Sequence, residues 1–184
     1  MKHQNDSDIG MQKQDKRKGT VIYMGNIEFP DKCAAAHRVI NNGKILRALG
    51  YRVGFLGVAK EERFDGVRVS SYDDHIYEEA YPESGRQWIK HLFSVDHLLS
   101  LAERYSDLKL VVVYNLPYVT YLSVKNAFKN TEIKVAYDCT EWSSYTEGSV
   151  FKRIYKKIDG FAVIHFLGKR SDNIIAVSSM MAKR

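Results

Sequence analysis

Residues 21–25 have the sequence VIYMG, a short apolar run that follows a polar amino terminus and ends at a glycine. Runs of β-favouring side chains without polar alternation are typical of strands that are buried on both faces of a sheet. The period then changes, because apolar side chains recur at helical spacing from Ala34 to Leu49 and Gly50 follows as a helix stop. The sequence therefore predicts a buried first strand followed by a helix over residues 34–49.

The alternation of strand and helix continues along the sequence. Strands are predicted over residues 51–58, 67–70, 110–114, 133–137 and 174–177, and helices over residues 87–105, 118–129 and 150–167. Parallel strands need crossover connections, which are usually helices. We therefore expect an α/β fold with a Rossmann-like open parallel sheet that has helices on both faces. Ligands bind such sheets beyond the carboxyl ends of the strands, which here are Gly25, Asn26, Gly57, Asn115, Asp138 and Ser178.

The composition excludes several classes of protein. Of the 184 residues, 45% are apolar and 27% are charged, so the chain can form a core and is not disordered throughout. The longest uncharged apolar run, residues 161–167, is far shorter than the roughly 20 residues of a membrane-spanning helix. Cys33 and Cys139 match no metal or redox spacing, so we expect a reducing, cytoplasmic compartment and no metal site.

Charge and chain ends indicate the domain organisation. Residues 1–19 form a polar leader that we expect to be disordered, and residues 20–184 are expected to form one domain. The net charge of +6 is concentrated in residues 151–170, which carry six basic side chains against one aspartate. A single basic patch does not favour nucleic acid as a partner. Residues 178–184 begin a helix of about one turn, so the chain either ends raggedly or is the first half of something longer.

The loop after the first strand, residues 25–33, is a candidate ligand contact. It is too long and too poor in glycine for the dinucleotide fingerprint GxGxxG, which disfavours NAD or FAD. Gly25 and Asn26 remain candidates, because glycine permits close backbone approach and the next helix points its positive end at the loop. His37 and Arg38 follow on the first helical turn, where a cation opposes the helix dipole and an anionic ligand or acidic neighbour is expected. The alternative is an ordinary surface loop with solvated side chains.

The segment Asp138-Cys139-Thr140-Glu141-Trp142 directly follows a predicted buried strand. Its two carboxylates suit hydrogen bonds to a hydroxylated acceptor or a role as base, and Trp142 offers an apolar face of the kind on which sugars pack. Asn115 lies at the end of the neighbouring predicted strand and is a further candidate for binding substrate. The alternative is structural, with Asp138 capping a turn and Trp142 in the core.

Residues 150–167 have an amphipathic pattern. Phe151, Ile154, Tyr155 and Ile158 share one helical face, and Lys152, Arg153, Lys156 and Lys157 lie on another. A basic face beside an apolar one suits anionic lipid headgroups, so peripheral contact with the inner face of the plasma membrane is one hypothesis. An ordinary covering helix with a solvated basic face is the other.

The order of segments resembles bacterial family-four glycosyltransferases of the GT-B architecture. The opening strand and helix resemble the start of that family, and YDCTEW at residues 137–142 is similar to the Asp-x-Thr-Glu-Trp stretch of one branch. The sequence SDNIIAVS at residues 171–178 resembles a recurring strand near the end of the family's amino-terminal domain. The resemblance covers nearly all of residues 20–184.

The resemblance implies one half of a GT-B fold. The family has two Rossmann-like domains that face a cleft, the first mainly for the acceptor and the second for the nucleotide-sugar, and its donor-binding Glu-x7-Glu pattern is absent from this sequence. By resemblance, Gly25 and Asn26 correspond to the first loop beside the donor phosphates. Residues 138–141 correspond to a loop where many relatives place a histidine that this chain lacks.

The implied reaction transfers a hexose from a nucleoside diphosphate sugar to a hydroxyl acceptor with retention, usually without a metal or other cofactor. The acceptor would be a cell-surface saccharide or a lipid-linked one, and the isolated chain is expected to be inactive. Alternatives are a non-catalytic Rossmann-like partner module that needs a second subunit, and another α/β enzyme, although no P-loop is present.

Overall fold

The computed structural model describes residues 17–61, 63–140, 150–167 and 173–176. The strands are β1 (Thr20–Gly25), β2 (Arg52–Val58), β3 (Val67–Tyr72), β4 (His75–Ala80), β5 (Leu108–Tyr114), β6 (Lys134–Cys139) and β7 (Ile174–Ala176). The helices are α1 (Ala34–Ala48), α2 (Gly85–Phe93), α3 (Asp96–Ala102), α4 (Tyr118–Ala127) and α5 (Val150–Ala162), and α5 continues into the π-helical turn η1 (Val163–Leu167).

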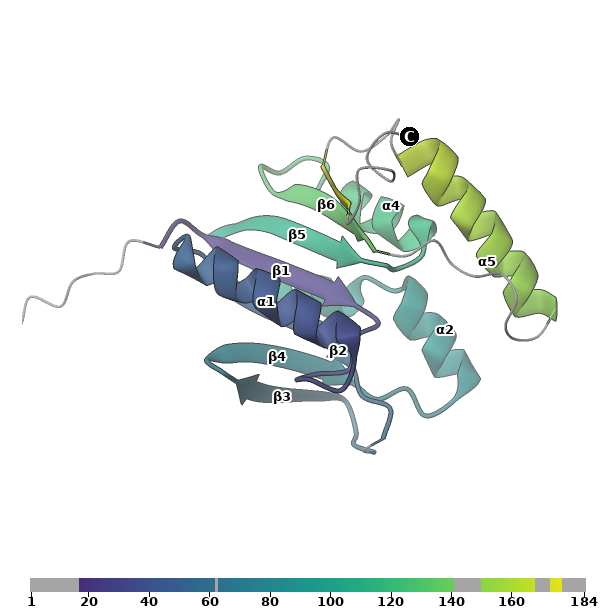
Figure 1. The fold of residues 1–184 in the computed structure, drawn as a ribbon, viewed down its shortest axis with the longest axis horizontal. Helices are drawn as coiled ribbons and strands as arrows, with labels where there is room; N and C mark the ends of the chain where they lie inside the picture. Colours follow the sequence, from purple (N-terminus) through teal and green to yellow (C-terminus); the bar gives the residue numbers. More distant parts are fainter. Residues whose placement is uncertain (1–16, 62, 141–149, 168–172, 177–184) are drawn as a thin grey trace, which may run out of the picture.

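The strands form one twisted sheet in the order β3-β4-β2-β1-β5-β6-β7. Neighbouring strands from β4 to β7 are parallel, and β3 alone of the described strands is antiparallel to its neighbour, β4. The predicted α/β fold with an open parallel sheet is therefore confirmed, and the structure adds one antiparallel strand, β3, at its edge. Figure 1 shows the strands side by side, with α1 lying across β1 and β2 and with α2 and α5 toward the arrowheads.

The antiparallel edge arises from a hairpin that the sequence pattern does not predict. Asp73 and Asp74 both adopt positive φ and turn the chain from β3 into β4. The sequence of β4, HIYEEA, does not have the apolar pattern of a buried strand, because Glu78 and Glu79 are adjacent. Both glutamate side chains are nevertheless buried. They are tolerated because basic side chains neutralise them from opposite faces of the sheet.

Glu78 and Glu79 lie on opposite faces of the sheet because successive side chains alternate along a strand. Arg104 and His97 contact the Glu78 carboxylate, at 2.6 Å and 3.1 Å, and Arg68 contacts that of Glu79 at 3.1 Å. Burial alone would raise the pKa of Glu78, but its hydrogen bonds from Arg104 and His97 lower it below its ordinary value.

The helix predicted over residues 87–105 is two helices. A capping box starts α2, in which the Ser84 hydroxyl accepts from Gln87 N–H and the Gln87 side chain accepts from Ser84 N–H. Ser94 ends it, because its backbone is extended and its hydroxyl accepts from Asp96 N–H at the start of α3. Two short helices therefore replace one long helix.

Two apolar layers hold the sheet, one on each face. Under α1 lie Val21, Tyr23, Phe55, Val112 and Ala136 with Val39 and Ile40 of the helix. The other face packs Ile22, Met24, Val111, Val113 and Tyr137 against α3, α4 and Leu167. Successive side chains of a strand alternate between these layers, so residues two positions apart on one strand belong to the same layer. Among the described residues, no helix has the length and apolar character needed to cross a bilayer.

Candidate functional site

The register of the central strands places three residues at one level near the carboxyl edge of the sheet. Gly25 of β1 is paired with Tyr114 of β5, and Tyr114 with Asp138 of β6. Tyr114 and Asp138 lie on the α1 face, because Val112 and Ala136, two residues earlier on the same strands, belong to the layer under α1. The ends of β1, β5 and β6 therefore lie at one level, and Tyr114 and Asp138 are on the face that α1 covers.

An ion pair joins this level to α1. The guanidinium of Arg38 donates to Asp138 Oδ1 at 2.9 Å, and 100 residues separate the two in the chain. The Asp138 side chain is 0% exposed, whereas that of Arg38 is 32% exposed. Asp138 is thus an acidic neighbour of the kind expected for a cation on the first helical turn, and the Arg38 side chain remains partly exposed.

The pair leaves two polar atoms unsatisfied. Arg38 Nε and Asp138 Oδ2 are both buried and have no hydrogen-bond partner within the described part of the chain. Burial raises the pKa of Asp138 above its ordinary value, and the hydrogen bond from Arg38 opposes that rise. A buried carboxylate with a spare oxygen is costly, so this pair is a polar cluster that the apolar core does not explain.

His37 and Arg38, considered together in the sequence, are separated by the structure. His37 is exposed on the outer side of α1, while Arg38 turns toward the sheet. Asn42, four residues after Arg38 and so on the same helical face, donates to the Tyr23 hydroxyl at 3.2 Å. Burial raises the pKa of Tyr23. Tyr23 and Asn42 thus form a second polar contact under α1, which was not predicted, although the spacing from Arg38 indicates Asn42.

Asn115 uses its side chain to join two strand ends. Its backbone has a positive φ of 46° directly after β5. Its carbonyl oxygen accepts from Thr140 N–H at 3.0 Å, its amide donates to the Thr140 hydroxyl, and that hydroxyl donates to the Tyr114 hydroxyl at 3.2 Å. Asn115 therefore fixes the chain that leaves β6 beside the end of β5, and it is exposed there.

The loop from β1 to α1 folds inward. Ile27 and Phe29 are buried in the layer under α1, Ile27 O accepts from Val58 N–H at 2.8 Å, and Phe29 N–H donates to Glu79 at 2.9 Å. A Cβ at Gly57 of β2 would lie 2.3 Å from Ile27 O, so the loop can lie this close to β2 only because residue 57 is a glycine. The expected alternative of an ordinary surface loop therefore does not describe these apolar side chains.

Gly25 and Asn26 differ in their surroundings. A Cβ at Gly25 would lie 2.9 Å from the Ile27 side chain and 3.0 Å from Tyr114 O, so packing within the chain already requires a small residue there. Asn26 is exposed beside it. Glu28, which the sequence analysis did not single out, is buried and lies within 3.9 Å of Lys32 and 3.7 Å of Lys60.

Several predicted site residues cannot be placed. Glu141 and Trp142 lie outside the described residues, as does the side chain of Lys152. Arg153 and Lys157 are exposed on α5, and Lys156 is partly buried there.

Both cysteines are free and half-buried, and burial raises the pKa of Cys139. Within the described ranges, no three His, Cys, Asp or Glu side chains cluster as metal ligands would.

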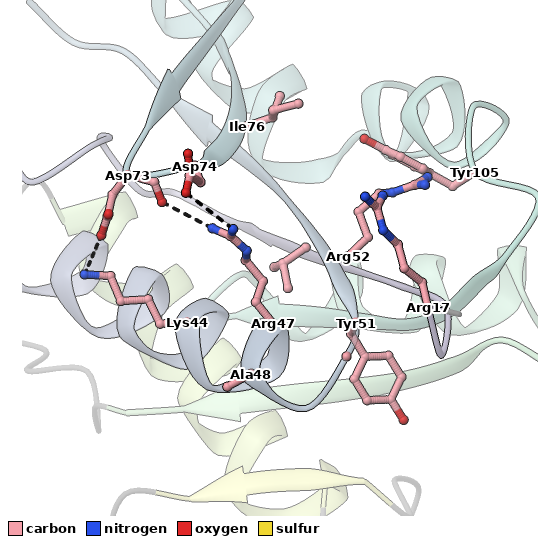
Figure 2. Close-up of a pocket in the computed structure, with 12 residues that line it drawn as sticks. Arg17, Lys44, Arg47, Ala48, Tyr51, Arg52, Asp73, Asp74, Ile76 and Tyr105 are labelled. Atoms are coloured by element: carbon pink, nitrogen blue, oxygen red, sulfur yellow. Dashed lines mark hydrogen bonds and ion pairs between the residues drawn. The ribbon is translucent and has the colours of Figure 1, made fainter. Parts of the chain in front are cut away.

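A hollow of about 880 Å³ lies at the opposite, amino edge of the sheet. Figure 2 shows Lys44 and Arg47, from the end of α1, pointing at Asp73 and Asp74 of the hairpin. Lys44 contacts Asp73 at 2.6 Å, and Arg47 contacts Asp74 at 3.7 Å. These charges satisfy one another, and sheets of this kind bind ligands at the carboxyl edge, so the hollow is no part of the candidate site.

No protein-family model matches the chain, and neither does any curated protein. Solved structures do match. The catalytic domain of starch synthase IV from Arabidopsis thaliana, bound to ADP and acarbose, has a TM-score of 0.50 at 9% identity over 80% of this chain. An alpha-glucosyltransferase in complex with UDP and DNA has a TM-score of 0.46 at 11% identity over 88% of this chain. The trehalose-6-phosphate synthase of E. coli, bound with UDP-2-fluoro glucose, has a TM-score of 0.44 at 9% identity over 65%.

These likenesses concern the fold. The starch synthase match supports an α/β fold like that of a Rossmann-like part of a GT-B glycosyltransferase. The chain spans 39% of that structure, 37% of the alpha-glucosyltransferase and 32% of the E. coli enzyme.

Proposed function

We propose that this chain is the acceptor-side domain of a retaining, family-four glycosyltransferase of the GT-B architecture. In the proposed reaction, the acceptor oxygen bonds to C1 of a hexose while the bond from C1 to the nucleoside diphosphate breaks, and the hydroxyl proton passes to the departing diphosphate. The acceptor is a saccharide or a lipid-linked saccharide of polysaccharide biosynthesis. The nucleotide-sugar is held mainly by a second Rossmann-like domain, and the reaction as proposed uses no metal.

The observation that carries this proposal is the Arg38–Asp138 pair at the carboxyl edge. Asp138 fixes the guanidinium at 2.9 Å, and Arg38 remains 32% exposed. A fixed guanidinium presents several N–H donors in one plane, which suits hydroxyl or phosphate oxygens of a ligand. Because Asp138 is fully buried, its proposed role is to position Arg38 rather than to touch substrate. A catalytic role for Glu141 stays a prediction outside the described residues.

The surroundings of the pair support a ligand site. Gly25 and Tyr114 lie at the same level of the sheet as Asp138. Asn26 and Asn115 are exposed where β1 and β5 end. Sheets of this topology bind ligands beyond those ends, and the fold is like that of a nucleotide-bound starch synthase. We propose a cytoplasmic location for the reaction, because nucleotide-sugar donors are cytoplasmic in the family that the sequence resembles.

The test is a transfer assay on the intact protein as its host makes it. Nucleotide-sugars are supplied with saccharide acceptors, and release of nucleoside diphosphate is measured. We expect Arg38→Ala to raise the acceptor KM about tenfold, because a charge-assisted hydrogen bond to the ligand is lost. Asp138→Asn is expected to produce a smaller rise in KM, since Arg38 stays but loses its ionic partner.

The matched control is Arg47→Ala, which removes a guanidinium from the opposite end of α1. It should leave KM and kcat unchanged. Diphosphate release that is absent from the unsubstituted protein with every donor contradicts the proposed function. That result would favour the non-catalytic partner module that needs a second subunit.

A further inference from the structure

Helix α5 exposes an apolar stripe. Val150, Ile154, Ile158 and Phe161 are 67%, 52%, 64% and 56% exposed. Their spacing of four, four and three residues places them along one side of the helix. Exposed apolar side chains scattered singly need no explanation, but a continuous row of four large ones on one helix does.

The rest of the molecule holds this stripe outward. The Tyr155 ring, on another side of α5, meets the Phe93 ring of α2 edge-on at 5.9 Å. The Asp159 carboxylate accepts from Tyr118 N–H at 2.8 Å, at the start of α4, and Ala162 and Val163 pack against the core. Because these contacts use the inner side of α5, rotation of the helix to bury the stripe would break them.

Basic side chains flank the stripe. Arg153 and Lys157 are exposed and lie four residues apart in a row beside it. The acidic residue of α5, Asp159, points the other way, toward α4. The neighbouring α2 adds an exposed Ile89 together with exposed Arg86 and Lys90. Figure 1 shows α5 as a long helix at the margin of the molecule, toward the arrowheads of the strands.

We propose that the exposed side of α5, defined by Val150, Ile154, Ile158 and Phe161 with Arg153 and Lys157, binds the surface of an anionic lipid bilayer. The apolar side chains enter the boundary between headgroups and acyl chains, and the cations contact lipid phosphates. Charge selects this occupant, because the exposed charged side chains beside the stripe are cationic, whereas the phosphates of an anionic lipid surface are negative. The proposal goes beyond the glycosyltransferase function and does not depend on it.

The test is flotation of the protein with phospholipid vesicles. One set of vesicles is phosphatidylcholine alone, and the other contains about one-third phosphatidylglycerol. We expect binding to the anionic vesicles, weaker binding in high salt, and little binding to the neutral ones. Ile158→Asn and Lys157→Glu should each reduce binding to the anionic vesicles about fivefold to tenfold, the first by removing buried apolar surface and the second by charge repulsion.

Two matched controls separate this surface from the rest of the protein. Ile45→Asn changes an isoleucine on α1 that is 60% exposed, against 64% for Ile158, and Lys134→Glu reverses a charge on β6. Both controls should bind vesicles as the unsubstituted protein does. The far-ultraviolet spectrum and thermal midpoint of every variant establish that it is folded.

Three results would overturn the proposal. The first is equal binding to neutral and anionic vesicles, and the second is equal loss in the control variants. The third is self-association in sedimentation velocity that Ile158→Asn abolishes while vesicle binding is absent, which would assign the stripe to a second copy of the chain. Loss of vesicle binding with intact sugar transfer would leave the proposed function standing.

Discussion

His75 is buried beneath α1 without a polar partner. It is 1% exposed, its ring lies 5.3 Å from that of Phe55, and neither ring nitrogen has a hydrogen-bond partner within the described residues. Burial lowers the pKa of His75, and the nearby cation Arg47 lowers it further. The folded state therefore keeps this imidazole neutral at a pH where the unfolded chain takes up a proton.

The sign of the resulting pH dependence follows from that difference. Below the ordinary histidine pKa of about 6.5, the unfolded state binds one more proton than the folded state, so stability falls as pH falls. The slope from this group is at most about 1.4 kcal/mol per pH unit. We expect His75→Phe to flatten the fall of the thermal midpoint between pH 7 and pH 5 (about the range in which histidine titrates), measured by circular dichroism.

His37→Gln is the control for this prediction, because His37 is exposed on the outer side of α1. That variant should keep the pH dependence of the unsubstituted protein. An unchanged slope in His75→Phe would mean that carboxylates alone set the acid sensitivity and that burial of His75 does not contribute to it.

The pairing of Arg38 with Asp138 could not be predicted from the sequence, although each residue was predicted as a candidate. Asp138 was predicted as a candidate because it ends a buried strand, and that argument needs only local pattern. Its partner Arg38 lies 100 residues away, and no periodicity within either segment relates the two. The pairing follows from sheet order and from the face that α1 covers, which are properties of the assembled fold.

At the scale of elements, β4 depends on its buried carboxylates. The Glu79 side chain is 1% exposed and accepts from Phe29 N–H at 2.9 Å and from Arg68 at 3.1 Å. It thus connects the β3–β4 hairpin to the loop between β1 and α1. Removal of one partner from a buried pair is costly, since the remaining charge and amide lose their acceptor.

We expect Glu79→Leu to lower the free energy of unfolding by about 3 kcal/mol, measured in urea. Glu79→Gln should cost less, because the amide oxygen still accepts from Phe29 N–H. The control is Glu83→Gln, which breaks an ion pair with Arg63 whose side chains are 35% and 76% exposed. Surface ion pairs contribute about 0–1 kcal/mol. Equal decreases in the free energy of unfolding in Glu79→Leu and Glu83→Gln would therefore contradict a larger contribution from the buried pair.

The same element explains one failure of prediction. Helix α1, β2, β5, α4 and β6 were predicted to within two residues, because their apolar side chains recur at the period of their structure. The strand β4 was not, because adjacent glutamates mask it and the residues that neutralise them lie on β3 and α3 and just beyond α3. The break between α2 and α3 depends on the Ser94 hydroxyl, which a search for apolar period overlooks.

At the scale of the whole molecule, the alternation of strands and helices was enough to predict the α/β fold, because few topologies bury such strands. The candidate site was predicted less completely. The carboxyl edge was located, but the inward course of the first loop and the packing of Ile27 above Gly25 depend on contacts with Gly57 and Glu79. Those contacts join segments that no local pattern connects.

Charge at the carboxyl edge leads to the last prediction. Transfer from a nucleoside diphosphate sugar needs positive groups aimed at the departing diphosphate. At this edge Asp138 already neutralises the Arg38 guanidinium, and two carboxylates, those of Glu28 and Glu61, pair with Lys32 and Lys60. The described part of the edge therefore offers little surplus positive charge for a diphosphate, although it offers hydrogen-bonding groups for an acceptor.

We accordingly expect residues 1–184 alone to bind a saccharide acceptor weakly, with a Kd of about 1 mM or more, and to release no nucleoside diphosphate above background. The measurement compares this chain with the intact protein as its host makes it, whose mass is determined first, at equal molar concentration and with the same donors. Acceptor binding is followed by changes in amide resonances, with Arg38→Ala and Arg47→Ala as the test and the control. Turnover by residues 1–184 alone would contradict the prediction, because it would place the groups that stabilise the leaving diphosphate within this chain.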